Sequence, residues 1–360
     1  MSLAIVNGSS PQSGITLSVE PYVEALQSLG HQVTWYQCVD AGQRADTRPG
    51  GVTVRGAGIP IESLEMGANR LWVFPRRLRK IPESCVVLSD PTLIRVARFH
   101  PHTVVLVHDL LPLTAYADRA DARWMFRYLL PRLRAVPRVI VATATMRDEL
   151  TRRGVPPDRI RVVPYTHRLG THPDHIDRSV ERVRERREVR VLFVGTDRPF
   201  KNIDFVLRLA KAMEASQSGV RFVFTLLSRL KPSTWERIGS LRVGNLRVQQ
   251  NVLSTSPLYE QCDVLVNASL HEGFGRPLME AMAYGLPIVA NRIPPFIEIL
   301  ADSAILLDVG RLPDWVAALE SLGDPDVLRQ HAQRSLERSA AFSPETFRTR
   351  VADAFTDLPT

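Results

Sequence analysis

The sequence predicts an α/β protein made of two Rossmann-like, doubly wound domains. In both halves of the 360-residue chain, short apolar runs alternate with helical runs, which is typical of parallel sheets covered by helices. The length is more than one hydrophobic core usually needs and suits two domains. A polar stretch over residues 166–188 interrupts the alternation, so we expect the interdomain hinge there, together with a solvated helix leading into the second domain.

The first domain is expected to span residues 1–165. Short apolar runs predict buried strands at residues 3–6, 33–36, 86–88, 103–107 and 139–142. Helices are expected over residues 14–29, 123–133 and 146–153, where apolar residues recur at helical spacing. Gly154 and Pro156 predict the end of the last of these helices.

The second domain is expected to span residues 189–343. Its predicted strands cover residues 189–194, 221–227, 246–249, 263–267, 287–290 and 304–307. An apolar stripe predicts a helix over residues 203–213, and residues 345–355 are expected to form a closing helix. Two doubly wound halves bind ligands beyond the carboxyl ends of their strands, so we expect a central cleft there.

Composition favours a soluble cytoplasmic protein. No run of about 18 apolar residues suggests a transmembrane helix, and the chain begins with a strand-like run and not with a charged leader. The three cysteines are far apart and odd in number, so no disulfide framework is expected. The 46 basic and 38 acidic residues leave a net charge of +8, which favours anionic partners in general. The basic residues form no recognised nucleic-acid-binding element, and no nucleic acid is expected.

One basic segment also carries aromatic residues. It contains Arg70, Trp72, Phe74, Arg76, Arg77, Arg79 and Lys80. Such a segment is suited to anionic lipid headgroups, where each cation contributes about 1 kcal/mol near the surface. The alternative is an exposed helix or loop with no partner. Peripheral association with the inner face of a membrane is therefore one of two open interpretations.

The run over residues 269–285 carries the strongest chemical signal. It places Glu272 and Glu280 with seven residues between them, the first beside a Gly-x-Gly turn and the second expected on the opening turn of a short helix. Pro277 suits a first helical position. Gly273 and Gly275 allow bare backbone to approach a ligand, and free N–H groups of the turn favour anions. Acids that bind hydroxyl groups beside a phosphate site predict a nucleotide-activated sugar as ligand.

Fixed cations are expected to neutralise the phosphates. Lys201 and Arg198 follow the strand at residues 189–194, and Arg276 is a third cation whose side chain could equally point away. A cation about 4 Å from a phosphate charge contributes about 4 kcal/mol at an effective dielectric of about 20. The one Asp-x-Asp pair, Asp324 and Asp326, looks like a helix N-cap, so no metal is expected.

Four motifs together resemble the retaining, GT-B-fold glycosyltransferases of the family-four type. The run over residues 269–285 is similar to the E-x7-E signature of that family. The stretches at 29–33, 107–110 and 194–202 look like its first helix-to-strand turn, an N-domain strand end and its first C-domain loop. The resemblance implies a nucleotide-diphosphate sugar donor. It also implies that the closing helix, residues 344–358, packs back on the N-terminal domain.

The resemblance also assigns roles in the second domain. Glu272 would contact the transferred sugar, and Glu280 the ribose of the nucleotide. The alternative for Glu280 is a helix-dipole complement. Backbone N–H groups would hold sugar or phosphate oxygens; they belong to Gly273, Phe274 and Gly275. Gly195 and Lys201 keep the family spacing of the phosphate loop, whereas Thr196 stands where the family commonly has arginine.

In the first domain the resemblance singles out His108, which would touch the donor sugar near the reacting carbon. Asp109 is expected either to orient this histidine or to cap the next helix, although neighbouring side chains on a strand point to opposite faces. Gly8 and Gly14 bound a loop that either closes over the acceptor or the diphosphate or forms a plain turn. A structural role for His108 is the alternative.

We therefore expect a retaining, metal-independent hexosyltransferase with a weak preference for mannosyl- or rhamnosyl-type donors, as in many bacterial enzymes. The acceptor would be a polysaccharide precursor, a lipid-linked glycan or a small natural product. Two alternatives remain open. One is a GT-B nucleotide-sugar epimerase, and the other is a catalytically inactive subunit that binds a sugar nucleotide. Zinc-helix, dinucleotide and serine-hydrolase motifs are each incomplete in this sequence.

Overall fold

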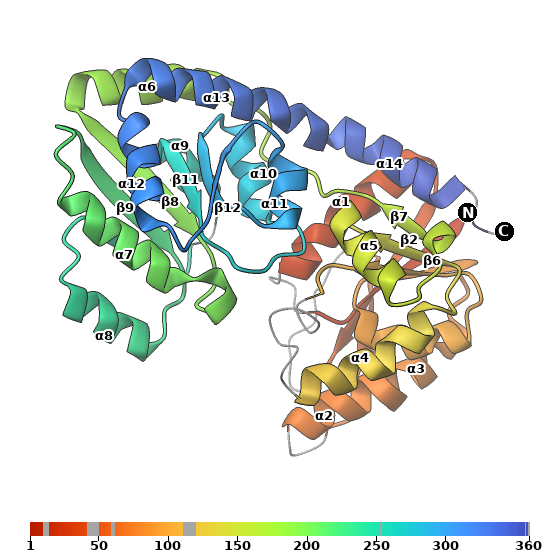
Figure 1. The fold of residues 1–360 in the computed structure, drawn as a ribbon. Coiled ribbons are helices and arrows are strands. Elements are labelled where there is room, and N and C mark those ends of the chain that lie inside the picture. The colour runs from red at the N-terminus through yellow and green to blue at the C-terminus, as the bar shows by residue number, and fades with distance from the viewer. Residues whose placement is uncertain are drawn as a thin grey trace. The chain divides into compact units, whose positions relative to one another are not determined.

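The computed structural model describes residues 1–9, 14–41, 50–58, 62–110, 120–252, 254–356 and 358. The chain divides into two compact units. The first contains Met1–Tyr165 together with Pro344–Thr360, and the second contains Thr166–Ser343. Each unit is built around one parallel sheet with helices packed against it, which confirms the predicted α/β fold class (Figure 1).

The sheet of the first unit has seven parallel strands in the order β3-β2-β1-β4-β5-β6-β7. Their bounds are β1 Ser2–Asn7, β2 Gln32–Val39, β3 Val52–Arg55, β4 Cys85–Leu88, β5 Thr103–Val107, β6 Arg138–Val141 and β7 Ile160–Val162. All five predicted strands are present. The sequence analysis missed β3 and β7 because these edge strands are short, and β3 is largely exposed and has no apolar run.

The helices of the first unit include one from the far end of the chain. Their bounds are α1 Gly14–Ser28, α2 Glu62–Ala68, α3 Phe74–Arg77, α4 Ala120–Leu133, α5 Ala144–Arg152 and α14 Pro344–Thr356. Shorter helical turns cover Asn69–Val73, Leu78–Lys80, Pro91–Arg98 and Pro157–Arg159. In Figure 1, α14 runs beside α1, and the Tyr22 and Phe347 rings meet edge to face at 4.9 Å. The C-terminal helix thus contributes to the core of the first unit.

The sheet of the second unit has six parallel strands in the order β10-β9-β8-β11-β12-β13. Their bounds are β8 Glu188–Val194, β9 Arg221–Leu227, β10 Leu246–Gln249, β11 Val264–Asn267, β12 Ile288–Asn291 and β13 Ile305–Leu307. All six were predicted to within one residue at each end. The central strands β8, β11 and β12 are apolar runs that are largely buried on both faces, which is why their sequence pattern was clear.

The helices of the second unit are α6 Asp174–Arg186, α7 Ile203–Glu214, α8 Pro232–Leu241, α9 Ser256–Gln261, α10 Arg276–Ala283, α11 Pro294–Leu300, α12 Leu312–Ser321 and α13 Pro325–Ser339. Short helical turns cover Pro199–Lys201 and Ala340–Phe342. Figure 1 shows α6 and α13 side by side, in agreement with their contacts.

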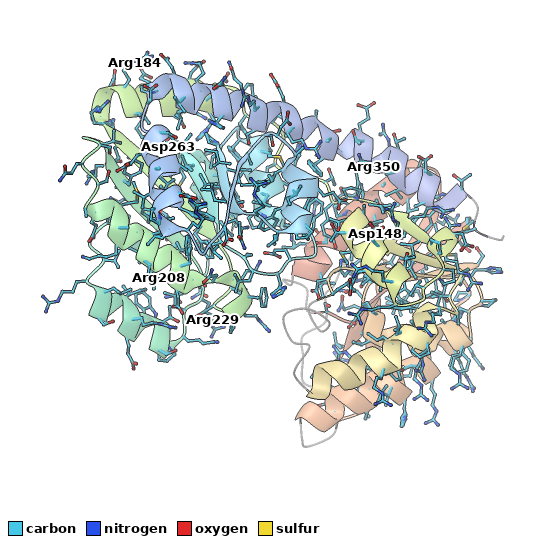
Figure 2. The ribbon with its side chains drawn as sticks, viewed as in Figure 1. Asp148, Arg184, Arg208, Arg229, Asp263 and Arg350 are labelled. Carbon is cyan, nitrogen blue, oxygen red and sulfur yellow. The ribbon has the colours of Figure 1, made fainter. Side chains whose placement is uncertain are left out.

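The expectation of a solvated helix before the second domain was wrong. Although α6 is rich in charge, it buries Ile176, Val180 and Val183 in the core of the second unit. Arg182 on its polar face forms an ion pair with Asp263, a fully buried carboxylate that also accepts from the Arg190 backbone N–H and is labelled in Figure 2. The helix is therefore an integral part of the second unit.

In each sheet the order of the strands reverses at one point, the switch point, where open parallel sheets bind ligands. In the first sheet the change lies between β1 and β4, and in the second between β8 and β11. In open parallel sheets ligands bind beyond the carboxyl ends of the strands at such switch points. Gly8 follows β1, Gly195 follows β8 and Ser269 lies two residues beyond β11. The predicted motif residues therefore lie at the edges that the topology favours.

Candidate functional site

Two loops meet at the switch point of the second sheet. One follows β8 and the other follows β11, and the Leu270 backbone N–H donates to the Phe200 carbonyl oxygen at 2.7 Å. Across this junction, Lys201 Nζ and Glu272 Oε1 form an ion pair. Their side chains are only 15% and 11% exposed. Two residues singled out from separate motifs are thus direct partners.

Glu272 is also held from within its own loop by a residue that the sequence analysis did not select. Ser269 Oγ donates to Glu272 Oε1 at 3.0 Å, and its backbone N–H donates to Asn267 Oδ1 at 3.1 Å. Asn291 Nδ2 in turn donates to the Ser269 carbonyl oxygen at 2.9 Å. All three polar residues are buried. In the sequence, the polar residues Asn267 and Ser269 at the end of the apolar run of β11 could have indicated that they hold the Glu272 loop.

The loop after β8 contains two constrained backbone positions. A Cβ added at Gly195 would lie 2.9 Å from the Phe193 ring, so glycine is needed there to fit the neighbouring side chain. Asn202 adopts the left-handed conformation with φ of 54°, which asparagine tolerates better than most residues. That turn ends the short helix carrying Lys201 and starts α7. Thr196, where the family commonly has arginine, is exposed.

Arg198 lines a pocket whose lining includes neither Lys201 nor Glu272. Its side chain is exposed and lines a pocket of about 270 Å³ between the starts of α7 and α8. Lys231 and Arg237 line the same pocket, with Asp197 and Asp204 opposing them. Arg237 pairs with Asp204 at 2.8 Å. Lys201 and Arg198, the two cations of the loop after β8, therefore have different surroundings in this structure.

The glycine turn before α10 requires glycine at one position. Gly275 has φ of 96°, and a Cβ there would lie 2.8 Å from the Phe296 ring. Phe274 beside it is buried, with its ring edge to face with Phe342 at 5.8 Å. Gly273 precedes both in the same loop. The turn is thus anchored by an aromatic side chain and leads the backbone into α10.

The position of Glu280 differs from the sequence expectation. With Gly275 as N-cap, Arg276 is the first helical residue and Pro277 the second, so Glu280 lies in the second turn of α10. Glu280 was predicted on the opening turn and lies one turn later. Pro277 was predicted at the first helical position and lies at the second. Because the helix-dipole effect falls off within the first turn, the dipole alternative for Glu280 loses its physical basis.

The Glu280 carboxylate is held on both oxygens. Tyr259 Oη donates to Oε2 at 2.8 Å, and Arg276 Nη2 donates to Oε1 at 3.3 Å. Tyr259 is fully buried, and burial, followed by the charge of Glu280, raises its pKa well above the usual value. Arg276 therefore points toward its neighbour on the helix. No sequence signal marked Tyr259.

A buried polar network lies at the carboxyl edge of the first sheet. Asn7 Nδ2 donates to Thr16 Oγ1 at 2.9 Å and to Gln37 Oε1 at 3.0 Å, and Asn7 Oδ1 accepts from Ser89 Oγ at 2.8 Å. Asn7, Gln37 and Ser89 belong to or follow neighbouring strands. The network therefore fixes the end of β1 where the glycine loop begins.

Gly8 is closely packed at the start of that loop. A Cβ there would lie 2.7 Å from Asp90 Oδ2, and the Gly8 carbonyl oxygen accepts from Arg70 Nη2 at 3.0 Å. Arg70 also lies 3.6 Å from both Asp40 Oδ2 and Asp90 Oδ2. Gly14 is the first residue of α1, and residues 10–13 between them lie outside the described residues.

His108 follows β5 and has both ring nitrogens in hydrogen bonds. Nε2 lies 2.9 Å from the Ser89 carbonyl oxygen, and Nδ1 lies 2.6 Å from Tyr165 Oη. Because a carbonyl only accepts, Nε2 carries a hydrogen, and in the neutral ring Nδ1 then accepts from the Tyr165 hydroxyl. Tyr165 and Ser89 thus orient the ring. Asp109, next in sequence, was one candidate for that role.

The Asp-x-Asp pair is a helix cap. Asp324 accepts from the Asp326 and Val327 backbone N–H groups at 2.8 and 3.3 Å, at the start of α13. This confirms the predicted N-cap. Among the described residues, no group of three or more His, Cys, Asp or Glu side chains is arranged to hold a metal ion.

Only part of the predicted basic and aromatic segment is exposed on the protein surface. Trp72 is 42% exposed, and Arg76, Arg77, Arg79 and Lys80 are exposed as well. Phe74 is buried in the core, and Arg70 is largely covered and points to Gly8, Asp40 and Asp90, so neither side chain belongs to the exposed basic surface. No helix in the described part of the chain is long and apolar enough to cross a membrane.

Two family profiles match most of the chain. Glycosyltransferase Family 4 matches residues 13–165, and Glycosyl transferases group 1 matches residues 188–324. The chain therefore belongs to the GT-B glycosyltransferases of the family-four type, which confirms the resemblance noted in the sequence.

Individual relatives are distant. The chain is 28% identical over 262 residues to MMP alpha-(1->4)-mannosyltransferase of Mycolicibacterium hassiacum, a match covering 64% of this chain and 61% of that protein. It thus spans less than two thirds of that relative. It is 26% identical over 271 residues to O-antigen chain mannosyltransferase B of Escherichia coli, covering 70% and 69% of the two chains.

Solved structures share the fold across the chain. HepE of Anabaena, solved in complex with UDP-glucose, superposes with a TM-score of 0.78 at 14% identity, covering 99% of this chain and 100% of that one. Sucrose-phosphate synthase of Thermosynechococcus elongatus gives 0.80 at 17% identity, covering 99% of each. At these identities the comparison establishes the GT-B fold alone.

Proposed function

We propose that this protein is a retaining glycosyltransferase that moves a hexose from a nucleotide-diphosphate sugar to an acceptor hydroxyl. The observation that carries the proposal is the contact between Lys201 and Glu272 at the switch point of the second sheet. A cation for phosphate and a carboxylate for hydroxyl groups meet where a doubly wound unit binds its ligand. Glu280, on the helix that follows, supplies a second carboxylate.

The ion pair between Lys201 and Glu272 supports a proposed mode of donor binding. A diphosphate oxygen competes with Glu272 for Lys201 Nζ, and Glu272 is then available to accept sugar hydroxyls. The cation stabilises the charge that develops on the leaving diphosphate, a contribution of about 4 kcal/mol for one contact of about 4 Å at a surface-like dielectric. Lys201 and Arg198, in place of a metal ion, are the proposed source of that stabilisation.

The proposed reaction needs no protein base. The bond between the anomeric carbon and the diphosphate oxygen breaks, and the acceptor oxygen bonds to the same face of that carbon. The acceptor proton passes to the leaving diphosphate. From the first unit, His108, oriented by Tyr165 and Ser89, and the loop that begins at Gly8 are the proposed contributors to substrate binding.

Mannose is the first sugar to test as the donor group. The relatives described above are named as mannosyltransferases, whereas the solved HepE complex holds UDP-glucose. A glycan or lipid-linked acceptor is proposed because one relative acts on the O-antigen chain, as its name states. A thermal-shift screen with UDP, GDP, ADP and dTDP sugars will identify the donor.

The decisive variant is Glu272→Gln, with Glu236→Gln as control. Glu236 is an exposed glutamate on α8 of the same unit, so the control makes the same chemical change away from the loops. We expect Glu272→Gln to lower transfer at least about 100-fold, a size typical of lost transition-state contacts, with an unchanged far-UV spectrum. The rate is measured as nucleoside diphosphate released together with glycosylated acceptor.

The same assay separates the alternatives. Near-normal transfer by Glu272→Gln contradicts the proposed role of that carboxylate. Conversion of the sugar nucleotide without a glycosylated product indicates an epimerase. Binding of the sugar nucleotide without hydrolysis or transfer indicates an inactive binding subunit.

A further inference from the structure

The loop that carries Glu272 packs against the last residues of the second unit. Phe274, two positions after Glu272, is buried, and its ring meets the Phe342 ring edge to face with centroids 5.8 Å apart. Phe342 is also buried and belongs to the short helical turn Ala340–Phe342. Aromatic rings in this geometry attract one another beyond the effect of the area that they bury. The Glu272 loop therefore has a second support besides Ser269.

The backbone of Phe342 is held by the segment at which the chain enters the second unit. That unit begins at Thr166 and ends at Ser343. The Phe342 carbonyl oxygen accepts from Thr166 Oγ1 at 2.8 Å and from the His167 backbone N–H at 3.3 Å. Thr166 and His167 are both buried. The first residues of the unit and its last turn are thus joined at one carbonyl oxygen.

The ring of Phe342 is held as well. The Arg338 guanidinium lies over it, 5.4 Å from the ring centre. Arg338 also donates to two backbone carbonyl oxygens near the end of α11, from Nε at 2.8 Å and from Nη2 at 3.1 Å. The same helix supplies Phe296, whose ring leaves no room for a side chain at Gly275. Neighbouring residues of the glycine turn therefore lie against two rings that Arg338 connects.

We propose that Phe342 is a positioning residue for Glu272. Its ring holds the glycine turn through Phe274, and its carbonyl oxygen ties that turn to the segment at Thr166. The inference rests on the proposed function, in which Glu272 accepts sugar hydroxyls. Its physical basis is that packed neighbours must hold a functional side chain to within about 0.5 Å, and that a misplacement of about 1 Å costs about 100-fold in rate.

The test measures kcat and the donor KM of full-length Phe342→Leu, with the donor that the thermal-shift screen identifies. Leucine keeps an apolar side chain in the core but removes the ring that meets Phe274. We expect kcat at saturating donor to fall about tenfold or more, because Glu272 is then held less well in the transition state. Thermal unfolding is followed alongside, so that every rate is measured on folded protein.

The matched control is Phe205→Leu in the same unit. Phe205 lies on α7 and has the same kinds of contact as Phe342: an edge-to-face partner, Trp315 at 4.9 Å, and an arginine over its ring, Arg208 at 5.7 Å. In the described structure it belongs to a core cluster of which Phe274 is not a member. We expect a comparable loss of stability, with kcat within about twofold of wild type.

A double-mutant cycle tests whether the two rings act together. It combines Phe342→Leu with Phe274→Leu. If Phe342 acts through Phe274, the double variant loses no more of kcat than the more affected single variant, whereas independent losses multiply. A change in stability alone does not produce this pattern in kcat.

The outcomes for the inference and for the proposed function differ. Normal kcat in Phe342→Leu, equal losses in Phe342→Leu and Phe205→Leu, or multiplying losses in the cycle overturn the inference and leave the proposed function standing. If the wild-type protein transfers no sugar from any donor tested, the proposed function fails and the inference with it.

A second variant serves if Phe342→Leu does not fold. Thr166→Val keeps the shape of the side chain but removes the hydroxyl that holds the Phe342 carbonyl oxygen. Its control is Thr103→Val, which removes a threonine hydroxyl bonded to the His100 carbonyl oxygen in the first unit. We expect the lower kcat in Thr166→Val, and equal kcat values in these two variants overturn the inference.

Discussion

Lys201 and Glu272 come from two motifs and lie 71 positions apart in the sequence. Both side chains are mostly removed from water, so either charge would destabilise the fold if it had no partner. A charged side chain that is mostly removed from water needs a partner, because desolvation without compensation costs several kcal/mol. In the described structure each is the ion-pair partner of the other. In the proposed binding mode the ligand supplies new partners: a donor phosphate replaces Glu272 at Lys201, and a sugar hydroxyl replaces Lys201 at Glu272.

At the same scale, Gly275 offers a test of the glycine turn. Its positive φ and the nearby Phe296 ring make any side chain strained. We expect Gly275→Ala to lower the free energy of unfolding by about 1–3 kcal/mol, as measured by urea denaturation.

The matched substitution is Gly239→Ala inside α8, where an added Cβ meets no heavy atom within 4 Å. Alanine is the better helix former, so stability should rise by about 0.5–1 kcal/mol. Equal effects of the two substitutions would show that the backbone at Gly275 is not constrained as described.

At the scale of elements, the helical segment from Glu62 to Lys80 shows what a sequence pattern leaves undecided. Basic and aromatic residues lie close together in the sequence, but Phe74 and Leu78, four residues apart on the helical segment, pack into the core of the first unit. What remains outside is Trp72 with Arg76, Arg77, Arg79 and Lys80. We propose that this exposed face, the basic face, contacts anionic lipid.

The basic face is tested by charge reversal. We expect the wild-type protein to cosediment with vesicles containing phosphatidylserine at low salt, and Arg79→Glu/Lys80→Glu to weaken binding by more than about tenfold, since each cation contributes about 1 kcal/mol. Salt should weaken wild-type binding as well.

The control for the basic face reverses two exposed arginines of the second unit, Arg184 and Arg208, both labelled in Figure 2. It makes the same change in net charge. If this variant loses vesicle binding equally, net charge and not the basic face is responsible.

The helix α6 differs from this segment, because a sequence that looked fully exposed contributes buried residues to a core. Its sequence is dominated by arginine and glutamate, which favoured a solvated interpretation, yet a narrow apolar stripe packs on the second unit beside α13. Charge content alone does not separate an exposed helix from an amphipathic one, because long charged side chains can lie along the rim of a buried stripe.

At the scale of the whole molecule, His175 predicts how stability depends on pH. It is buried on α6, and desolvation, with Arg178 and Arg182 nearby, lowers its pKa to about 4, although a hydrogen bond to the Glu260 carbonyl opposes the shift. The unfolded chain, with a pKa near 6.5, binds the proton more readily. The neutral histidine therefore contributes stability that is complete above about pH 6.5 and is lost as the pH falls toward 4.

The expected loss is on the order of 3 kcal/mol between pH 7 and pH 4. It is measured as the shift in urea midpoint, and His175→Gln should flatten that dependence because glutamine keeps a donor but does not titrate. His102→Gln in the first unit serves as the control. An identical pH profile for wild type and His175→Gln would refute this account.

Much of the fold and part of the candidate site followed from sequence. The buried strands were found because parallel strands read as continuous apolar runs, and β3 and β7 were missed because short edge strands lack that run. Glu272 and Lys201 were selected because they follow predicted strands, and the structure brings these two side chains together in an ion pair. Tyr259 and Ser269 were missed, because their roles arise from contacts that no local pattern encodes.

The amino-acid sequence alone determined the α/β class, all strands except β3 and β7, and the family, since these depend on local periodicity and on residue types at short spacing. The tertiary structure decided which charges pair, which arginine points where, and that Glu280 lies in the second turn of α10 with a buried tyrosine behind it. The physical reason is that a buried polar group must find its partner in space, and the partner comes from whichever element the packing brings alongside.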